Sequence, residues 1–282
     1  MTKYILTILI FFRVILLNGQ DSTGIRQIME EEQEILKKFE QIYDLPQSEK
    51  RDSINNVIIK KLSKELSTWD GFYYKWNALE MIGRVSSDDN RVKVFTWYLQ
   101  TGQNSYRYYG LLAYSEKKFP LGEELFRVVE LKDHSLNIRD PENKILTPDN
   151  WYGAVYYTLK TYTHRRNSWY ALIGFDFNDN FSNKKIIEIL TIGKNGEIQF
   201  GGDIHLGEEK KVRRLVFEYS SEVAMSVNYD ENLGMIVYDH LRPYQPFFEG
   251  NFRFYAPDGS YDGLRFEKGE FYREEDLDAR NY

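Results

Sequence analysis

The sequence contains no cysteine among its 282 residues. This excludes a disulfide framework, a thiolate metal site and a lipid-modified N-terminal cysteine. Histidine is also rare, and its four positions do not show the His-Glu-x-x-His or His-x-His spacing of a zinc site. These positions are His134, His164, His205 and His240. The fold must therefore be stabilised by apolar burial, for which the chain is long enough.

Two further absences bear on partners. The net charge is −6, and Lys and Arg are interspersed with Asp and Glu rather than clustered. Nucleic acid is therefore not an expected partner, because phosphate binding needs a concentrated basic surface. The sequence has no Gly-rich phosphate loop, and we expect no cofactor. After residue 20 no apolar run approaches the roughly 20 residues of a membrane-spanning helix.

Residues 1–20 follow the order of a secretory signal peptide. Lys3 precedes an apolar run, Ile5–Phe12, which Arg13 interrupts and Val14–Leu17 continues. Polar and small residues, including Gly19 and Gln20, close the segment. Because a charge divides a stretch shorter than a membrane span, cleavage near Gly19 or Gln20 is favoured over retention as a membrane anchor. We expect the mature protein in the periplasm or on the cell surface.

Residues 21–68 predict a helical hairpin. Apolar side chains recur at helical spacing over residues 22–43 and again over residues 48–67, and Pro46 separates the two stretches. Sustained heptads are missing. This favours packing of the two helices against the rest of the chain over a coiled coil that binds a partner.

Residues 69–282 predict a β body, because the apolar period changes to two. Strand Val92–Tyr98 is expected to pair with Ser105–Tyr114, Ala154–Tyr162 with Ser168–Phe175, and Ile186–Ile192 with Glu197–Gly201, whose connection contains Asn195-Gly196. Near the C-terminus we expect a strand at Asn251–Tyr255 and a turn at Pro257–Gly259.

The predicted fold class is mainly β, with the N-terminal helical hairpin followed by an antiparallel multi-sheet body. Strands that recur every 8–12 residues with turns between them are typical of sandwiches, barrels and propellers. Acidic turns lead into apolar strands at Ser87–Phe95 and again at Tyr229–Val237. This faint repeat keeps a propeller-like body open as one arrangement.

One polar cluster is a weak metal candidate. Asp176, Asn178 and Asn180 alternate as the first three ligands of a calcium loop do. Phe181 then stands where the loop needs Gly, and Ile187 where it needs the bidentate Glu. Asp and Asn also dominate ordinary turns. We therefore predict a plain hairpin turn and no metal.

Aromatic residues are abundant, with 22 Tyr, 18 Phe and 5 Trp. They suit pleated strands and also binding surfaces. Trp151 and Tyr152 are adjacent at the entry to a predicted strand, so we expect at least one of them to reach the surface or a groove. Trp169 opens the strand that pairs with the one after Tyr152. These three are the predicted binding residues, although core packing is the default explanation for aromatic side chains on strands.

Several segments of the sequence resemble an uncharacterised family of exported proteins from Bacteroidota. The resemblance extends approximately from Trp69 to the C-terminal end, and it implies a periplasmic or cell-surface location without supplying any catalytic residue. The segments that carry it are Leu146–Gly153, Phe181–Glu188, Val216–Ser220, Met235–Leu241 and Glu275–Asn281.

The leading functional hypothesis is an exported, non-catalytic envelope protein that binds a protein or glycan partner through an aromatic-rich β surface. The alternative is a glycan-directed hydrolase or a carbohydrate-binding module, because the sequence also holds 43 Asp and Glu residues. An open pocket with two carboxyl groups about 5–10 Å apart, beside an exposed aromatic ring, would favour the hydrolase.

Overall fold

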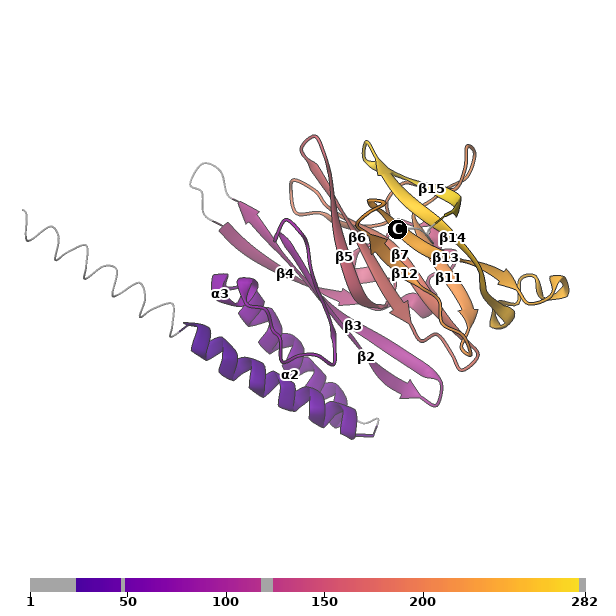
Figure 1. Ribbon diagram of the computed structural model, residues 1–282. Coiled ribbons are helices and arrows are strands. Elements are labelled where there is room, and N and C mark those ends of the chain that lie inside the picture. Colours follow the sequence, from indigo (N-terminus) through magenta and orange to yellow (C-terminus); the bar gives the residue numbers. More distant parts are fainter. Residues whose placement is uncertain (1–23, 47–48, 118–123, 279–282) are drawn as a thin grey trace, which may run out of the picture. The chain divides into compact units, whose positions relative to one another are not determined.

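A computed structural model describes residues 24–46, 49–117 and 124–278 (Figure 1). The signal-peptide prediction for residues 1–20 lies outside the described residues. The chain divides into two compact units. The first consists of the chain up to Glu80 together with Ala113–Val128, and the second of Met81–Leu112 together with Val129–Tyr282.

The first unit contains the predicted helical hairpin. One helix runs through residues 24–44 and α2 through Glu49–Leu66, with Pro46 between them. Lys61 on α2 joins the two helices, because its Nζ lies 2.6 Å from Glu31 Oε2 and 2.8 Å from Glu34 Oε2. The facing apolar side chains are buried, namely Ile28, Ile35, Phe39 and Ile42 of one helix and Ile58, Leu62 and Leu66 of the other.

A short helix, α3 (Trp69–Tyr73), follows α2. The Thr68 side chain caps it by accepting a hydrogen bond from the Gly71 amide. Glu32 is buried on the first helix, where its carboxylate accepts bonds from the Ala78 amide at 2.9 Å and the Tyr74 hydroxyl at 2.8 Å. No helix in the described ranges is both long enough and apolar enough to cross a membrane.

The strands in the described part of the chain form three sheets. The first has the strand order β1 (Gly83–Ser86), β2 (Val92–Gly102), β3 (Ser105–Lys117) and β4 (Glu124–Lys132). The second has the order β11 (Arg214–Ser220), β7 (Ser182–Ile192), β6 (Asn167–Asp176) and β5 (Val155–His164), and β8 (Ile198–Phe200) also pairs with β7. The third has the order β10 (Lys211–Val212), β9 (Ile204–His205), β15 (Glu270–Leu277), β14 (Tyr255–Glu267), β13 (Met235–Pro243) and β12 (Val227–Asp230).

The predicted hairpins are confirmed. β2 neighbours β3, β5 pairs with β6 antiparallel, and β7 pairs with β8 antiparallel. The second and third sheets contribute to one apolar core, in which Ile173 and Ile187 of the second meet Ile236 and Leu264 of the third. The described strands therefore form a mainly β body in which two sheets share one core, rather than the radial repeat of a propeller.

Two local predictions near the C-terminus are wrong. Residues Phe252–Phe254 form a 3-10 turn instead of a strand, and Pro257–Gly259 lies within β14 instead of forming a turn. Pro257 still pairs with Leu241, while a bulge interrupts the register between Asp239 and Leu241. Gly259 adopts a φ of 91°. The bulge and this glycine let the strand pass through a sequence that would otherwise turn.

Candidate functional site

Two of the three predicted binding residues lie inside the protein. Trp151 is fully buried and Tyr152 nearly so, and the Trp151 Nε1 donates a hydrogen bond to the Tyr156 hydroxyl at 2.9 Å. The expectation that one of the two would reach the surface is wrong. Strand alternation does not apply to them, because β5 begins only at Val155 and Trp151 makes an isolated bridge to Asp133.

Trp169 lies elsewhere on the second sheet. It pairs with Tyr162, and its ring lies 5.5 Å from that of Phe266 beside the shared core. Tyr156 lies six residues from Tyr162 along β5, which corresponds to about 20 Å of extended strand. The structure therefore does not bring Trp169 together with Trp151 and Tyr152.

The most exposed cluster of aromatic rings is one that the sequence reasoning missed. It lies on the segment between β13 and β14, residues 244–254, here called the aromatic loop. Tyr244, Phe247 and Phe252 are between 44% and 77% exposed, and Phe181 beside them is 55% exposed. The Arg253 guanidinium lies over the Phe181 ring at 4.0 Å. The aromatic loop and Phe181 together form what we call the aromatic surface.

The aromatic loop is held by its own hydrogen bonds. The Tyr244 amide donates to the Phe254 carbonyl at 2.9 Å, and the Gly250 amide donates to the Tyr255 hydroxyl at 3.0 Å. The Phe248 ring stacks on Phe254 with 3.9 Å between ring centroids. A loop ordered in this way loses less conformational entropy when it binds. Its signal in the sequence is local density, since six of the twelve residues from Tyr244 to Tyr255 are aromatic.

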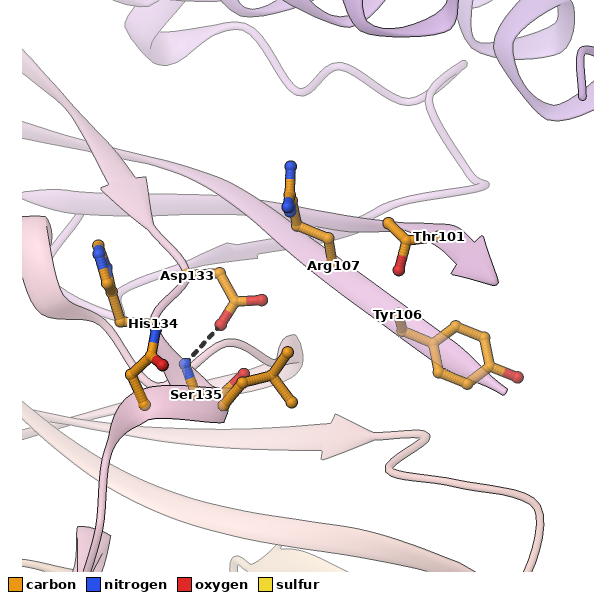
Figure 2. A pocket seen from close by; sticks show the side chains of 8 residues that line it. Thr101, Tyr106, Arg107, Asp133, His134 and Ser135 are labelled. Atoms are coloured by element: carbon orange, nitrogen blue, oxygen red, sulfur yellow. Dashed lines mark hydrogen bonds between the residues drawn. The ribbon is translucent and has the colours of Figure 1, made fainter. Parts of the chain in front are cut away.

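A small pocket of about 130 Å³ lies between the β2–β3 hairpin and the turn at residues 133–137 (Figure 2). Its lining comes from Thr101, Tyr106, Arg107, Asp133, His134, Ser135, Leu136 and Asn137. Asp133 is the one carboxylate among these lining residues. The Tyr108 and Ser135 amides each donate a bond of 2.9 Å to it.

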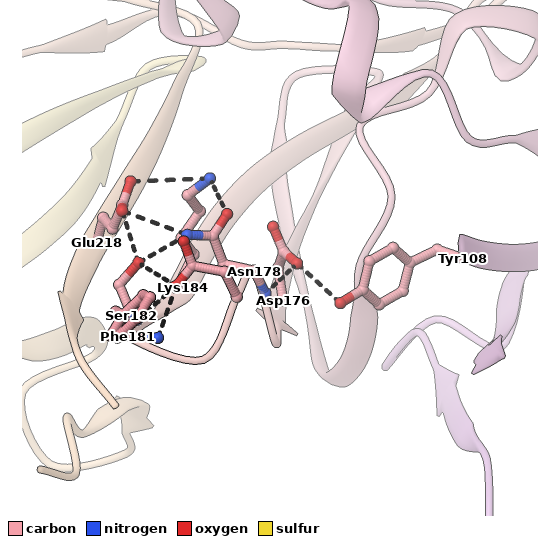
Figure 3. A network of polar contacts seen from close by, with 8 residues as sticks. Tyr108, Asp176, Asn178, Phe181, Ser182, Lys184 and Glu218 are labelled. Atoms are coloured by element: carbon pink, nitrogen blue, oxygen red, sulfur yellow. Dashed lines mark hydrogen bonds and ion pairs between the residues drawn. The ribbon is translucent and has the colours of Figure 1, made fainter. Parts of the chain in front are cut away.

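A polar network surrounds the buried Asp176 (Figure 3). The Tyr108 hydroxyl and the Asn178 amide each donate to its Oδ1 at 2.8 Å. Burial raises the pKa of Asp176, and the bond from Asn178 and the charge of Lys184 oppose that rise. Burial and the nearby Asp176 also raise the pKa of Tyr108 far above its usual range. This network joins β3 to the turn after β6.

In the same network, the weak calcium candidates are occupied by the protein's own groups. The Lys184 ammonium donates to Asn178 Oδ1 at 2.7 Å and lies 3.8 Å from the Glu218 carboxylate. Asn180 is exposed, and its carbonyl accepts a bond from the Ser221 hydroxyl. The Lys184 ammonium therefore takes the place that a calcium ion would need beside the Asn178 oxygen. Within the described part of the chain no three His, Cys, Asp or Glu side chains are grouped to hold a metal.

His240 belongs to a separate cluster on the third sheet. Its Nδ1 lies 2.9 Å from Oδ2 of the buried Asp262, and Arg273 Nη2 donates to the same oxygen at 2.8 Å. The β13–β14 bulge displaces His240 from the regular register. In this cluster the buried Asp262 carboxylate contacts both the His240 imidazole and the Arg273 guanidinium.

No protein-family model, curated protein or solved structure matches this chain, so no relative assigns a role to the aromatic surface, the pocket or the His240 cluster.

Proposed function

We propose that this chain is an exported, non-catalytic protein of the cell envelope that binds a protein partner through its aromatic surface. The observation that carries the proposal is the exposure of Phe247, 77% of whose surface faces solvent, in a loop whose ends are joined by hydrogen bonds. Exposed apolar patches of this kind mark interaction sites on many proteins.

The composition of the aromatic surface favours a protein over other partners. Interface centres are enriched in Phe, Tyr and Arg and depleted of Lys, Glu and Asp. From Tyr244 to Tyr255 the chain has six aromatic residues and Arg253, with Glu249 as the one acidic residue and no lysine. Arg253 lies over one ring, Phe181, and so adds a cation to the aromatic surface.

Export is supported by the sequence at the N-terminus. Residues 1–20 have the order of a signal peptide, and the resemblance to exported Bacteroidota proteins implies the same compartment. An envelope protein without cysteine depends on its core for stability, and the shared core of the second and third sheets can supply this. The partner is then expected among envelope proteins.

The pocket lacks the pair of carboxyl groups that a glycoside hydrolase needs. Hydrolysis by the common mechanisms uses two carboxyl groups that flank the scissile bond. Of the side chains that line the pocket, Asp133 alone is a carboxylate, and it accepts hydrogen bonds from two backbone amides. The pocket therefore gives no support to the hydrolase alternative.

The test is affinity capture from the native envelope, followed by affinity measurement with the recovered protein. Wild type is compared with Phe247→Ser and Phe252→Ser, and with Trp69→Ser as a matched control, because Trp69 is exposed but lies outside the aromatic surface. We expect both loop variants to weaken binding at least tenfold, or about 1.4 kcal/mol, and the control to bind as wild type. Equal binding by all four proteins would exclude the aromatic surface as the interface.

A further inference from the structure

We propose that the pocket between the β2–β3 hairpin and residues 133–137 binds one ring of a neutral saccharide. This site is distinct from the aromatic surface, and the proposal does not depend on the proposed function. Three features of the pocket lead to it: a fixed aromatic wall, a fixed hydrogen-bond acceptor, and polar side chains that are not otherwise engaged.

The wall is the ring of Tyr106 on β3. Its centroid lies 5.7 Å from that of Tyr98 and 5.2 Å from that of Phe177. These two rings fix the position of Tyr106, and Figure 2 shows Tyr106 across from the 133–137 turn, with its hydroxyl directed away from the turn. Aromatic rings combine an apolar face with, in tyrosine, a polar edge. Such a ring can stack on the C–H face of a sugar and bond to a hydroxyl.

The acceptor is Asp133. Its Oδ2 accepts from the Tyr108 amide and its Oδ1 from the Ser135 amide, so the carboxylate cannot rotate freely. Each oxygen keeps a second lone pair for a ligand hydroxyl. Gly153 packs so closely behind it that a Cβ at that position would lie 2.6 Å from the carboxylate. Backbone groups therefore preorganise this acceptor before any ligand arrives.

The remaining polar groups of the pocket have unused hydrogen-bonding capacity. In residues 24–46, 49–117 and 124–278, the side chains of Tyr106, Arg107, Ser135 and Asn137 make no hydrogen bond or ion pair with one another or with other groups. The His134 Nδ1 lies 3.2 Å from the Lys132 carbonyl, which can accept a hydrogen bond from it. Donors and acceptors thus surround one small cavity.

This combination selects a neutral, hydroxyl-rich ring. Asp133 and Arg107 carry opposite charges, so the lining as a whole does not attract a phosphate or carboxylate, while a metal cation would find a single carboxylate there. A sugar ring satisfies both halves of the pocket, because its hydroxyl groups donate and accept while its C–H groups contact apolar surface. Leu136, which is 90% exposed at the rim, offers additional apolar contact. The cavity of about 130 Å³ restricts binding to one ring.

The experiment is saturation-transfer NMR on the full mature chain with the methyl glycosides of glucose, galactose, mannose and N-acetylglucosamine, followed by titration. We expect saturable binding of at least one of the four, with a Kd on the order of 1 mM, which is about −4 kcal/mol. Tyr106→Ala should weaken this binding at least tenfold, Asn137→Ala should weaken it by a smaller factor, and Tyr106→Phe should retain most of it.

Tyr244→Ala is the matched control, because it removes an exposed tyrosine from the aromatic surface and should not change sugar binding. Asn137→Ala and Ser135→Ala remove no side-chain hydrogen bond within the described chain, so they test the pocket even where Tyr106→Ala impairs folding. Absence of binding by all four glycosides overturns the proposal. So does binding that Tyr106→Ala, Asn137→Ala and Ser135→Ala all leave unchanged. Neither result bears on the protein partner of the aromatic surface.

Discussion

The Nε of Arg214 lies 2.8 Å from the Oε2 of Glu188, and neither side chain is exposed to solvent. The two residues face each other across β11 and β7. Arg214 also donates to the Pro141 and Phe200 carbonyls, so one guanidinium joins two neighbouring strands to β8 and to the 3-10 turn at Pro141–Asn143. This ion pair is the central polar contact of the second sheet.

We predict that Arg214→Met lowers the free energy of unfolding by about 3–5 kcal/mol, because it leaves the Glu188 carboxylate buried without its cation. Urea denaturation measures the loss. The double variant Arg214→Met, Glu188→Met should recover most of it, because two apolar side chains of similar volume remove the uncompensated charge. A double variant no more stable than the single one would show that the carbonyl contacts of Arg214 matter more than its charge.

The stability of the single variant Arg214→Met should also depend on pH. Burial raises the pKa of Glu188 above its ordinary value of 4.5, and Arg214 opposes this rise. Without Arg214 the pKa rises further. An acid whose pKa is higher in the folded state binds its proton more tightly there. The free energy of unfolding therefore falls as the pH rises from the ordinary pKa through the raised pKa. The deficit of Arg214→Met relative to wild type should therefore be larger at about pH 8 than at about pH 5.

Chemical denaturation at the two pH values measures this difference. Arg214→Met combined with Glu188→Gln is the control, because glutamine does not titrate. The single variant should lose stability relative to this double variant as the pH rises from about 5 to about 8. A deficit of Arg214→Met that is equal at both pH values would contradict the assigned role of Glu188.

Two aromatic truncations should differ strongly in their effect on stability. Trp151→Ala should lower the free energy of unfolding by about 3–5 kcal/mol, because it empties a fully buried site and removes the donor to Tyr156. Phe247→Ala should change stability by no more than about 0.5 kcal/mol, since most of that ring faces solvent. Thermal melts of both variants provide the comparison. A large loss from Phe247→Ala would assign the aromatic loop to folding instead of binding.

Calcium should not affect stability. The Lys184 ammonium already occupies Asn178 Oδ1 and neighbours Glu218, so these oxygens are engaged without a metal. Melting curves with calcium and with a chelator should coincide. A bound ion at 100 times its dissociation constant would add about 2.7 kcal/mol, which is readily visible. A calcium-dependent shift of the melting temperature that Asp176→Ala abolishes would contradict this prediction and support a calcium site at Asp176.

The mature chain should begin near Gln20 or Asp21. The apolar segment before Asn18 is interrupted by Arg13 and is shorter than a membrane span, which favours cleavage. Intact-mass analysis of the protein recovered from the envelope measures the new N-terminus. Recovery of a chain that still carries Met1–Leu17 would indicate an anchored protein. An Arg13→Leu variant, which makes the apolar run continuous, is expected to be cleaved less completely.

Local patterns predicted much of the architecture. The 3.6-residue spacing from Ile25 onward predicted the helical hairpin, and the period of two predicted the β5–β6 and β7–β8 hairpins, although β7 begins at Ser182 and not at Ile186. Both depend on neighbours within a few residues, which the sequence shows directly. The turn predicted at Pro257–Gly259 is wrong because a bulge on the facing strand β13, between Asp239 and Leu241, allows β14 to continue.

The sequence by itself determined the helical hairpin, the alternating strands and the absence of a thiolate or zinc motif, because each is a matter of residue type and short spacing. Only the tertiary structure decided which aromatic rings are exposed. Trp151 is enclosed, while Phe247 lies on a loop that leaves the sheet. It also brought Tyr106 and Asp133 to one pocket from separate segments. Burial depends on what packs opposite a residue, and that neighbour can come from any part of the chain.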